Sequence, residues 1–206
     1  MTPRMLSWIA QATNGRLVGT DRAIDAVATD TRALPQGRAA LFVALKGENF
    51  DGHDHVAAAA AGGCVAALVS CEVDVAIPQV VVADSERALG ELAVAVQRER
   101  TMNVLAITGS NGKTSVKTLL LSILQQMGGA YANPGNRNNE IGLPLAVLDA
   151  PDDARVAVYE MGAGKPGDIA YLTAIARPDV ALVNNIAPAH LEHMGSLLGV
   201  ADTKAA

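Results

Sequence analysis

The chain has 206 residues; half are hydrophobic, only 3% are aromatic, and the formal net charge is −5 at pH 7. These values predict a core of small aliphatic side chains in one or two domains. The negative charge gives no reason to expect a nucleic acid or a membrane surface as a partner. The sequence shows no signal-peptide pattern, and its most apolar run, residues 57–69, is too short to cross a bilayer. We therefore expect a cytoplasmic protein, with Cys64 and Cys71 as reduced core residues.

The first hundred residues alternate between short helical and strand-like segments. Helices are predicted over 5–12, 55–61 and 85–100, the last with Ser85 as its N-cap. Strands are predicted at 17–18, 26–28, 40–45, 65–69 and 80–82. This alternation predicts a small α/β domain over residues 1–100, and no internal repeat interrupts it.

Two polar segments of this domain directly follow predicted strands. Thr29-Asp30-Thr31-Arg32 comes after strand 26–28, and the loop 46–54 comes after strand 40–45. Open α/β sheets bind their ligands at the carboxyl ends of strands. We therefore expect a ligand site formed by these two segments.

A glycine-rich segment opens the second half of the chain. It reads Thr108, Gly109, Ser110, Asn111, Gly112, Lys113, Thr114, and it follows an apolar run at 104–107. A helical segment comes next, with apolar residues at Val116, Leu120, Ile123, Leu124 and Met127. A strand, a glycine-rich turn and a helix in this order are typical of a loop that binds nucleotide phosphates.

The residue types in this loop suit that chemistry. Glycines let backbone N–H groups approach phosphate oxygens, and the helix N-terminus attracts the anion. Lys113 is predicted to reach the outer phosphates, and the Thr114 hydroxyl to ligate Mg²⁺. The spacing is shorter than the usual G-x-x-x-x-G-K-[ST], which would place glycine at Ile107. An ordinary glycine-rich turn with a solvated lysine is the alternative.

Three later segments are candidates to face the same ligand. Residues 133–140 form a loop rich in asparagine, which is either a set of turns or a source of amides for a ligand. Glu160 ends the predicted strand 155–159, where a second magnesium ligand belongs. His190 follows the predicted buried strand 179–183 and is a candidate metal ligand at the same sheet edge, with a plain surface histidine as the alternative. With a helix at 168–176, these segments predict a second, parallel-sheet domain over 101–206.

Taken together, these motifs resemble those of the Mur ligases, the ATP-dependent amide-forming enzymes of peptidoglycan precursor synthesis. The resemblance covers nearly the whole chain. The segments that carry it are 29–32, 41–47, 50–54, 108–117, 135–144 and 184–192. It implies an N-terminal UDP-substrate domain followed by a central ATPase domain. The implied cofactors are ATP and Mg²⁺, and the implied substrates are UDP-MurNAc-tripeptide and D-Ala-D-Ala, handled by a monomer.

The resemblance also implies roles for particular residues. Catalytic roles fall to Lys113, His190 and Lys204. ATP would be bound by the loop 108–114 together with Asn138 and Asn139. The implied magnesium ligands are Thr114, Glu160, His190 and Lys204, the last as a lysine carbamoylated by CO₂. The implied ligands of the UDP-substrate are Thr31, Arg32, Lys46, Gly47, Asp51 and His53.

The chain also departs from the family pattern. Gly164 and Lys165 stand where the family usually has Asn-His, and after Lys204 the chain reads Ala205-Ala206 where the family continues with Gly-Glu. We therefore expect an incomplete central domain and no C-terminal domain. One alternative is a fragment that only binds the UDP-substrate or nucleotide. Another, a generic phosphate-loop kinase or folylpolyglutamate-type ligase, fits the loop 108–114 but not residues 136–139 or the N-terminal unit.

Overall fold

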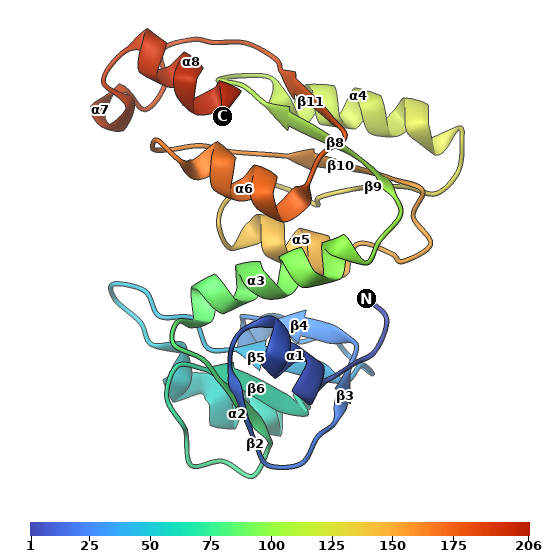
Figure 1. Ribbon diagram of the computed structural model, residues 1–206, viewed down its shortest axis with the longest axis vertical. Helices are drawn as coiled ribbons and strands as arrows, with labels where there is room; N and C mark the ends of the chain where they lie inside the picture. Colours follow the sequence, from blue (N-terminus) through green and yellow to red (C-terminus); the bar gives the residue numbers. More distant parts are fainter. The chain divides into compact units, whose positions relative to one another are not determined.

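The computed structural model describes residues 1–206, and the chain divides into two compact units, Met1–Ala95 and Val96–Ala206. Helix α3 (Ser85–Arg98) includes the division between them (Figure 1). Each unit has its own sheet and is described by itself.

The first unit is built on a five-stranded sheet with the order β2-β7-β6-β5-β4. Its strands are β2 (Arg16–Val18), β4 (Ala26–Ala28), β5 (Ala40–Val43), β6 (Ala66–Val69) and β7 (Gln79–Val81). All neighbours are parallel except β2, which runs antiparallel to β7. A second, two-stranded sheet pairs β1 (Arg4–Met5) with β3 (Ala23–Ile24). The carboxyl ends of β4, β5 and β6 therefore lie at one edge of the larger sheet.

Helices α1 (Leu6–Ala12) and α2 (Val56–Ala61) and two 3₁₀ turns, η1 (Thr31–Ala33) and η2 (Gly52–His55), complete this unit. Strands β5 and β6 are buried at every position, as expected for parallel strands covered on both faces. One cluster of the core gathers Phe42, Val56, Ala59 and Val69 with small alanine side chains. The core is thus built from the small aliphatic residues that the composition predicted.

The N-cap of α3 differs from the prediction. The Asp84 carboxylate accepts hydrogen bonds from the N–H groups of Glu86 (2.9 Å) and Arg87 (3.0 Å), so Asp84 caps the helix. Ser85 is buried, and its hydroxyl donates to the carbonyl of Ala44 at 2.6 Å. Asp84 and Ser85 both have side chains that can cap a helix. Because the Ser85 hydroxyl bonds to the Ala44 carbonyl, just after β5, Asp84 is the residue that caps α3.

The second unit has a four-stranded, all-parallel sheet with the order β11-β8-β10-β9. The strands are β8 (Asn103–Thr108), β9 (Ala130–Ala132), β10 (Val156–Glu160) and β11 (Val180–Val183). The helices are α4 (Lys113–Gln125), α5 (Gly142–Asp149), α6 (Asp168–Ala176), α7 (Leu191–Met194) and α8 (Leu197–Ala205).

The crossovers of this sheet run in opposite directions. The chain passes from β8 through α4 to β9 on one side, and from β10 through α6 to β11 on the other. Right-handed crossovers therefore place α4 on one face and α5 and α6 on the other, as Figure 1 shows. The neighbouring strands β8 and β10 thus send their chains to opposite faces, and a crevice opens between their carboxyl ends.

Two burial predictions were wrong. Strand β11 was expected to be buried, but it is an edge strand with all four residues exposed. Ile123 in α4 and Met127 just after the helix are 63% and 66% exposed, so their helical spacing does not bring burial. Cys64 is buried as predicted, but Cys71 is exposed; both are free thiols.

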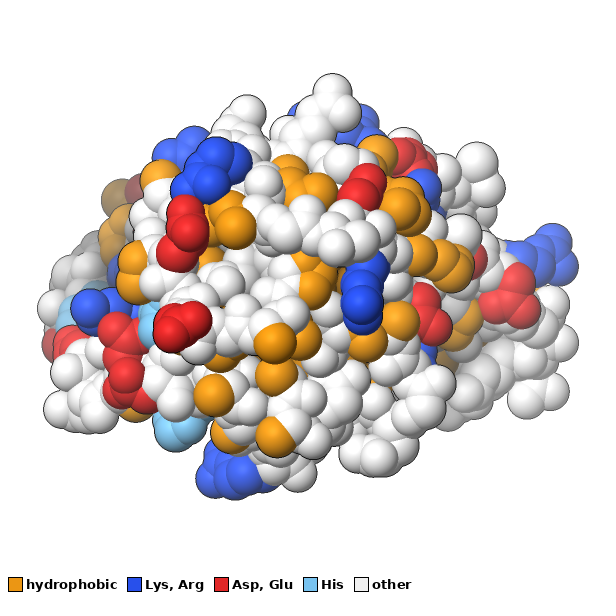
Figure 2. Space-filling view, turned by 90° about the horizontal axis from the view of Figure 1, so that it is seen from below, with side chains coloured by type: hydrophobic (Ala, Val, Ile, Leu, Met, Phe, Trp, Pro, Cys, Tyr) orange, Lys and Arg blue, Asp and Glu red, His pale blue; other side chains and the backbone are white.

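The face shown in Figure 2 carries both acidic and basic side chains. On the face shown in Figure 2, hydrophobic side chains are scattered among acidic and basic ones. None of the helices is both long and apolar enough to pass through a membrane.

The two phenylalanines offer a matched test of the first unit's core. Phe42 is 1% exposed and belongs to the core cluster, whereas Phe50 is 56% exposed. We expect Phe42→Ala to lower the free energy of unfolding by about 3–5 kcal/mol, since it leaves a cavity. Phe50→Ala is expected to change it by less than about 1 kcal/mol. Urea unfolding followed by circular dichroism measures both, and equal losses would contradict this account of the core.

Candidate functional site

The glycine-rich loop between β8 and α4 has the backbone of an anion-binding turn. Gly109 and Gly112 have φ values of 148° and 73°, which side-chain-bearing residues rarely adopt. At Gly109 a Cβ atom would also lie 3.1 Å from the backbone nitrogen of Asn185, so space as well as conformation requires glycine. Gly112 is the N-cap of α4, so the first N–H groups of that helix have no intrahelical partner.

The segment after β11 braces this loop. The N–H of Ser110 donates to the carbonyl of Asn185 at 3.1 Å, and the N–H of Asn111 donates to the Asn185 side chain at 2.9 Å. Asn184 donates its amide to the carbonyl of Asn111 at 2.8 Å. The Lys113 ammonium folds back onto the carbonyl of Gly109 at 2.8 Å. Hydrogen bonds from the segment after β11 and from Lys113 therefore fix the conformation of the loop.

Glu160, at the carboxyl end of β10, lies beside this loop and is only 3% exposed. Its Oε2 accepts from Thr114 Oγ1 (2.9 Å) and lies 3.1 Å from Lys117 Nζ. Its Oε1 accepts from the Asn138 amide (2.9 Å). Burial by itself raises the pKa of Glu160, but the hydrogen bonds from Asn138, Thr114 and Lys117 and the charge of Lys117 outweigh burial and lower it. The carboxylate is thus kept ionised.

The distance between Thr114 and Glu160 suits a shared Mg²⁺ ion. Two oxygens on adjacent positions of an octahedral Mg²⁺, each about 2.1 Å from the metal, lie about 3 Å apart. Thr114 Oγ1 and Glu160 Oε2 are 2.9 Å apart. A hydroxyl and a carboxylate are also the oxygen donors that Mg²⁺ prefers. The residues present fit the ion.

A cavity of about 550 Å³ opens next to Lys113. It unites four of the residues predicted from sequence: Lys113, Asn138, Asn139 and His190. Sequence reasoning gave no role to several others in its lining, namely Glu140, Lys165, Asp168 and His193. Gly162, Ala163 and Gly164 supply backbone to the same wall.

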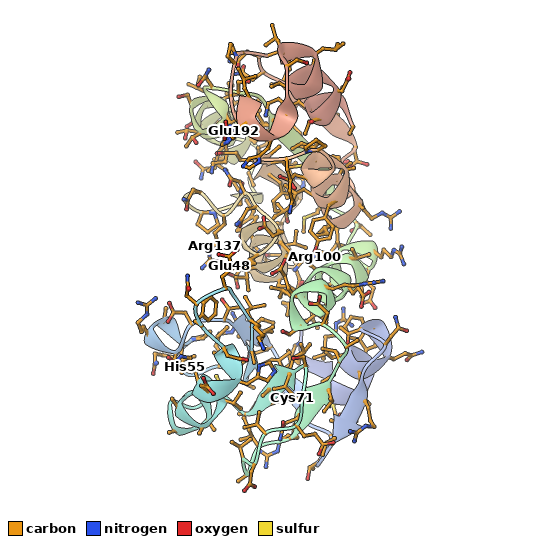
Figure 3. All side chains as sticks on the ribbon, turned by 90° about the vertical axis from the view of Figure 1, so that its left-hand side faces the viewer. Glu48, His55, Cys71, Arg100, Arg137 and Glu192 are labelled. Atoms are coloured by element: carbon orange, nitrogen blue, oxygen red, sulfur yellow. The ribbon has the colours of Figure 1, made fainter.

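Hydrogen bonds fix the orientation of Asp168, which lines this cavity, and an ion pair fixes that of Arg137 in the neighbouring asparagine-rich loop. Asp168 accepts from the N–H groups of Gly164 (2.8 Å) and Lys165 (2.9 Å), which shapes the turn before α6. Arg137, labelled in Figure 3, forms an ion pair with Asp149 at 2.6 Å. The asparagine-rich loop therefore presents an amide, that of Asn138, to Glu160.

Lys204 does not line this cavity. It lies in α8, is 4% exposed, and lines a separate cavity of about 110 Å³ together with Thr108. The Thr108 hydroxyl, expected to contact a nucleotide, is buried there without a hydrogen-bond partner. Burial first, and the charge of Lys113 second, lower the pKa of Lys204. Its amine is therefore more readily neutral than that of an exposed lysine.

In the first unit, the predicted substrate residues gather in the loops after β4 and β5. Thr31 begins η1, and Arg32 forms an ion pair with Asp30 at 2.6 Å. Lys46 lies 3.3 Å from the carboxylate of Asp51. Because β4 and β5 are parallel neighbours, the two polar segments that follow them lie at the same edge of the sheet.

Gly47 and His53 have internal partners in this same region. The N–H of Gly47 donates to the carbonyl of Phe50 at 3.0 Å. The backbone N–H of Ser70 donates to His53 Nε2 at 2.8 Å, so the other ring nitrogen carries the proton and donates to Asp51 at 2.5 Å. Both ring nitrogens are occupied, and His53 therefore orders the loop.

Two buried residues of the site were missed from sequence. Lys117 and Asn133 are 6% and 1% exposed, and both contact Glu160. The spacing held one signal, because Lys117 lies four residues after Lys113 and so on the same face of α4. Nothing in the sequence singled out Asn133 from the other asparagines of its loop.

The fold and the loop together define a class of protein. A parallel sheet with a phosphate-binding loop after its first strand, and a carboxylate ending the neighbouring strand, is the arrangement of nucleotide-binding α/β proteins.

Family comparisons narrow the class. Residues 107–206 match the Mur ligase middle domain, and residues 23–110 match the model described as Mur ligase family, catalytic domain. The two matches together extend from residue 23 to the end of the chain, and the chain belongs to the Mur ligase family.

Individual relatives agree with this assignment. The chain is 49% identical over 199 residues to UDP-N-acetylmuramoyl-tripeptide–D-alanyl-D-alanine ligase of Escherichia coli, covering 97% of this chain and 44% of the relative. It is 38% identical to the enzyme of the same name from Bacillus subtilis, covering 99% and 46%.

Solved structures show the same relationship. A crystal structure of MurF from Acinetobacter baumannii has a TM-score of 0.91 and 37% identity, covering 100% of this chain and 46% of that one. MurF ligase from Thermotoga maritima, solved in complex with ADP, has a TM-score of 0.79 and 35% identity, covering 88% and 42%. The chain thus spans less than half the length of these relatives.

The Asp51–His53 contact predicts how stability depends on pH. The backbone N–H and the ring of His53 lower the pKa of Asp51 to about 2 from an ordinary 3.8. A carboxylate with a lowered folded-state pKa contributes stability that is complete above its unfolded pKa and is lost as the pH falls from about 4 to about 2. We expect Asp51→Asn to be less stable than wild type at pH 7 and to show a smaller further loss over that window.

The measurement is thermal unfolding across pH, with Asp54→Asn as the control, since Asp54 is exposed and neighbours the same 3₁₀ turn. A difference between Asp51→Asn and wild type that stays constant from pH 7 to pH 2 would contradict the role of the hydrogen bonds between Asp51 and His53.

Proposed function

We propose that the chain is part of an ATP-dependent ligase that joins D-Ala-D-Ala to UDP-MurNAc-tripeptide. The single observation behind the proposal is the buried Glu160 carboxylate, held 2.9 Å from the Thr114 hydroxyl beside the phosphate-binding loop. Two further features support it: the 550 Å³ cavity beside Lys113, and the similarity to relatives named for this reaction.

The chemistry proceeds through an acyl phosphate. A carboxylate is a poor electrophile, so the terminal carboxylate of the tripeptide first receives a phosphoryl group. The amine of D-Ala-D-Ala then attacks the acyl carbon, and the tetrahedral intermediate releases phosphate and leaves an amide. Such reactions are catalysed chiefly by positioning and by neutralising charge on the transferring group.

The residues of this chain divide that work. The free N–H groups at the start of α4 bind phosphate oxygens, and Lys113 leaves the Gly109 carbonyl to neutralise the outer phosphates. Thr114 and Glu160 would hold Mg²⁺, which supplies further charge neutralisation when bound. Asn138 keeps the Glu160 carboxylate oriented.

Lys204 is proposed to carry a carbamate. Its neutral amine would attack CO₂, forming an N–C bond and losing a proton to solvent, so a buried cation becomes a carboxylate-like group. The lowered pKa of Lys204 and its burial near the positive charge of Lys113 favour this reaction. His190 lines the cavity beside Lys113, whereas Lys204 lines a separate cavity, so a second Mg²⁺ shared by His190 and the carbamate stays a prediction from the family resemblance.

The loops of the first unit are proposed to bind the UDP-substrate. Thr31, Arg32 and Lys46 supply exposed or half-exposed donors and positive charge for the diphosphate. Gly47, Asp51 and His53 shape the loop that carries Lys46. The cytoplasmic location and the monomeric state stay predictions. A chain that only binds UDP-substrate or nucleotide is the second candidate, since it spans less than half of its relatives.

Phosphate release by the chain separates the two candidates. We would supply Mg-ATP, UDP-MurNAc-tripeptide and D-Ala-D-Ala and omit each in turn. Release that requires all three supports a complete ligase site, while ADP and UDP-substrate binding without release supports the binding role. Absence of nucleotide binding would contradict the ligase, and absence of both nucleotide and UDP-substrate binding would contradict both candidates.

Removing the loop lysine tests the phosphate site directly. Lys113→Ala should weaken Mg-ADP binding at least about tenfold, since one charge-assisted contact with phosphate is worth about 1.5–3 kcal/mol. It should also abolish any ATP-dependent phosphate release. Isothermal calorimetry gives the affinity, and Arg22→Ala, an exposed residue of the first unit, serves as the control. Unchanged affinity in Lys113→Ala would remove Lys113 from the site.

A further inference from the structure

Lys117 is a buried lysine with every donor engaged. Its side chain is 7% exposed, and Nζ lies 3.0 Å from the carbonyl oxygen of Asn133, 2.8 Å from that of Gly135 and 3.1 Å from Glu160 Oε2. An ammonium group has three N–H donors, and here each has a partner. Lys117 therefore has no donor left for a ligand, and any effect on binding must act through these partners.

The asparagine-rich loop, whose carbonyls accept from Lys117, also forms hydrogen bonds with the end of β10. The Asn133 amide oxygen accepts from the Glu160 N–H at 2.9 Å, and its nitrogen donates to the Glu160 carbonyl at 3.1 Å. The Asn133 side chain thus pairs with the backbone of Glu160 as a neighbouring strand would. Lys117 holds the Glu160 carboxylate, and through Asn133 it supports the backbone of the same residue.

The remaining contacts of the carboxylate show what this arrangement permits. A carboxylate offers about four acceptor positions, and here Oε1 accepts from Asn138 while Oε2 accepts from Thr114 and Lys117. If the Thr114 hydroxyl rotates its proton away, an acceptor position on Oε2 opens beside the Thr114 oxygen. A cation can then replace one hydrogen bond while Lys117 and Asn138 keep the carboxylate in place.

We propose that Lys117 is a positioning residue, which holds Glu160 in the orientation that accepts a divalent cation shared with Thr114. This inference rests on the proposed nucleotide and Mg²⁺ site. Without the ammonium, a 3% exposed carboxylate loses its cationic partner, and an unpaired buried charge is costly enough to make it move or draw in water. The alternative is that Lys117 only anchors the carbonyls of residues 133 and 135.

A double-mutant cycle on the 206-residue chain separates these roles. ADP affinity would be measured by calorimetry, with MgCl₂ and with EDTA, in wild type, Lys117→Met, Glu160→Gln and the double variant. We expect Lys117→Met to weaken ADP binding about tenfold in Mg²⁺, a coupling within the range for contacting residues, and much less in EDTA. In the Glu160→Gln background the same change should cause no further loss in Mg²⁺.

Several outcomes would overturn the inference. Equal losses in Mg²⁺ and EDTA, or additive losses in the double variant, would show that Lys117 only anchors the loop. No loss, or a gain, in Mg²⁺ would show that Glu160 is held without it. If wild type binds no ADP, the proposed function itself fails, and the inference falls with it.

Folding is controlled with two further variants. Ser122→Ala removes a hydroxyl on the same helix that donates only to the Thr118 carbonyl, and it should leave ADP affinity unchanged. Lys117→Gln keeps a donor for the loop carbonyls and removes the charge. If Lys117→Met fails to show a cooperative thermal transition, Lys117→Gln takes its place in the cycle and is judged by the same outcomes.

Discussion

The second unit depends on one buried carboxylate. Glu160 is held by a hydroxyl and an ammonium from helix α4 and by an amide from the asparagine-rich loop. Its own backbone is paired by Asn133, so neither the side chain nor the strand end moves independently. A charge buried to this degree is tolerated only when its acceptor positions are filled. Satisfying Glu160 is therefore the condition that joins helix α4, the asparagine-rich loop and strand β10.

The sheet topology explains why these groups meet. The chain leaves β8 toward one face and β10 toward the other, so the two strand ends are adjacent while the segments after them diverge. The phosphate-binding loop and Glu160 are placed at that divergence, where a ligand reaches backbone N–H groups and a carboxylate at once. The same logic applies to the first unit, where the ends of β4, β5 and β6 bring Arg32, Lys46 and Ser70 to one edge.

The sequence predicted the structural elements that depend on local residue patterns. Most strands, the helix over 168–176 and the glycine-rich turn between β8 and α4 follow from periodicity and glycine placement, and the structure confirmed these elements. Burial that depends on distant partners was not predictable. Ile123 and Met127 have helical spacing but lie on a face that nothing covers. Lys117 reads as a surface lysine, because the carbonyls that bury it lie 16 and 18 residues further along the chain.

Among the buried charged side chains of the chain, that of Lys204 has no partner of opposite charge. Three residues with an ammonium or carboxylate side chain are buried: Lys117, Glu160 and Lys204. Lys117 and Glu160 neutralise each other at 3.1 Å, but no acidic side chain pairs with Lys204, and the charge of Lys113 acts against it. An unpaired buried ammonium is unfavourable, so either its proton is lost or a negative charge arrives beside it. The carbamate proposed for Lys204 would remove the ammonium and would place a negative charge near Lys113.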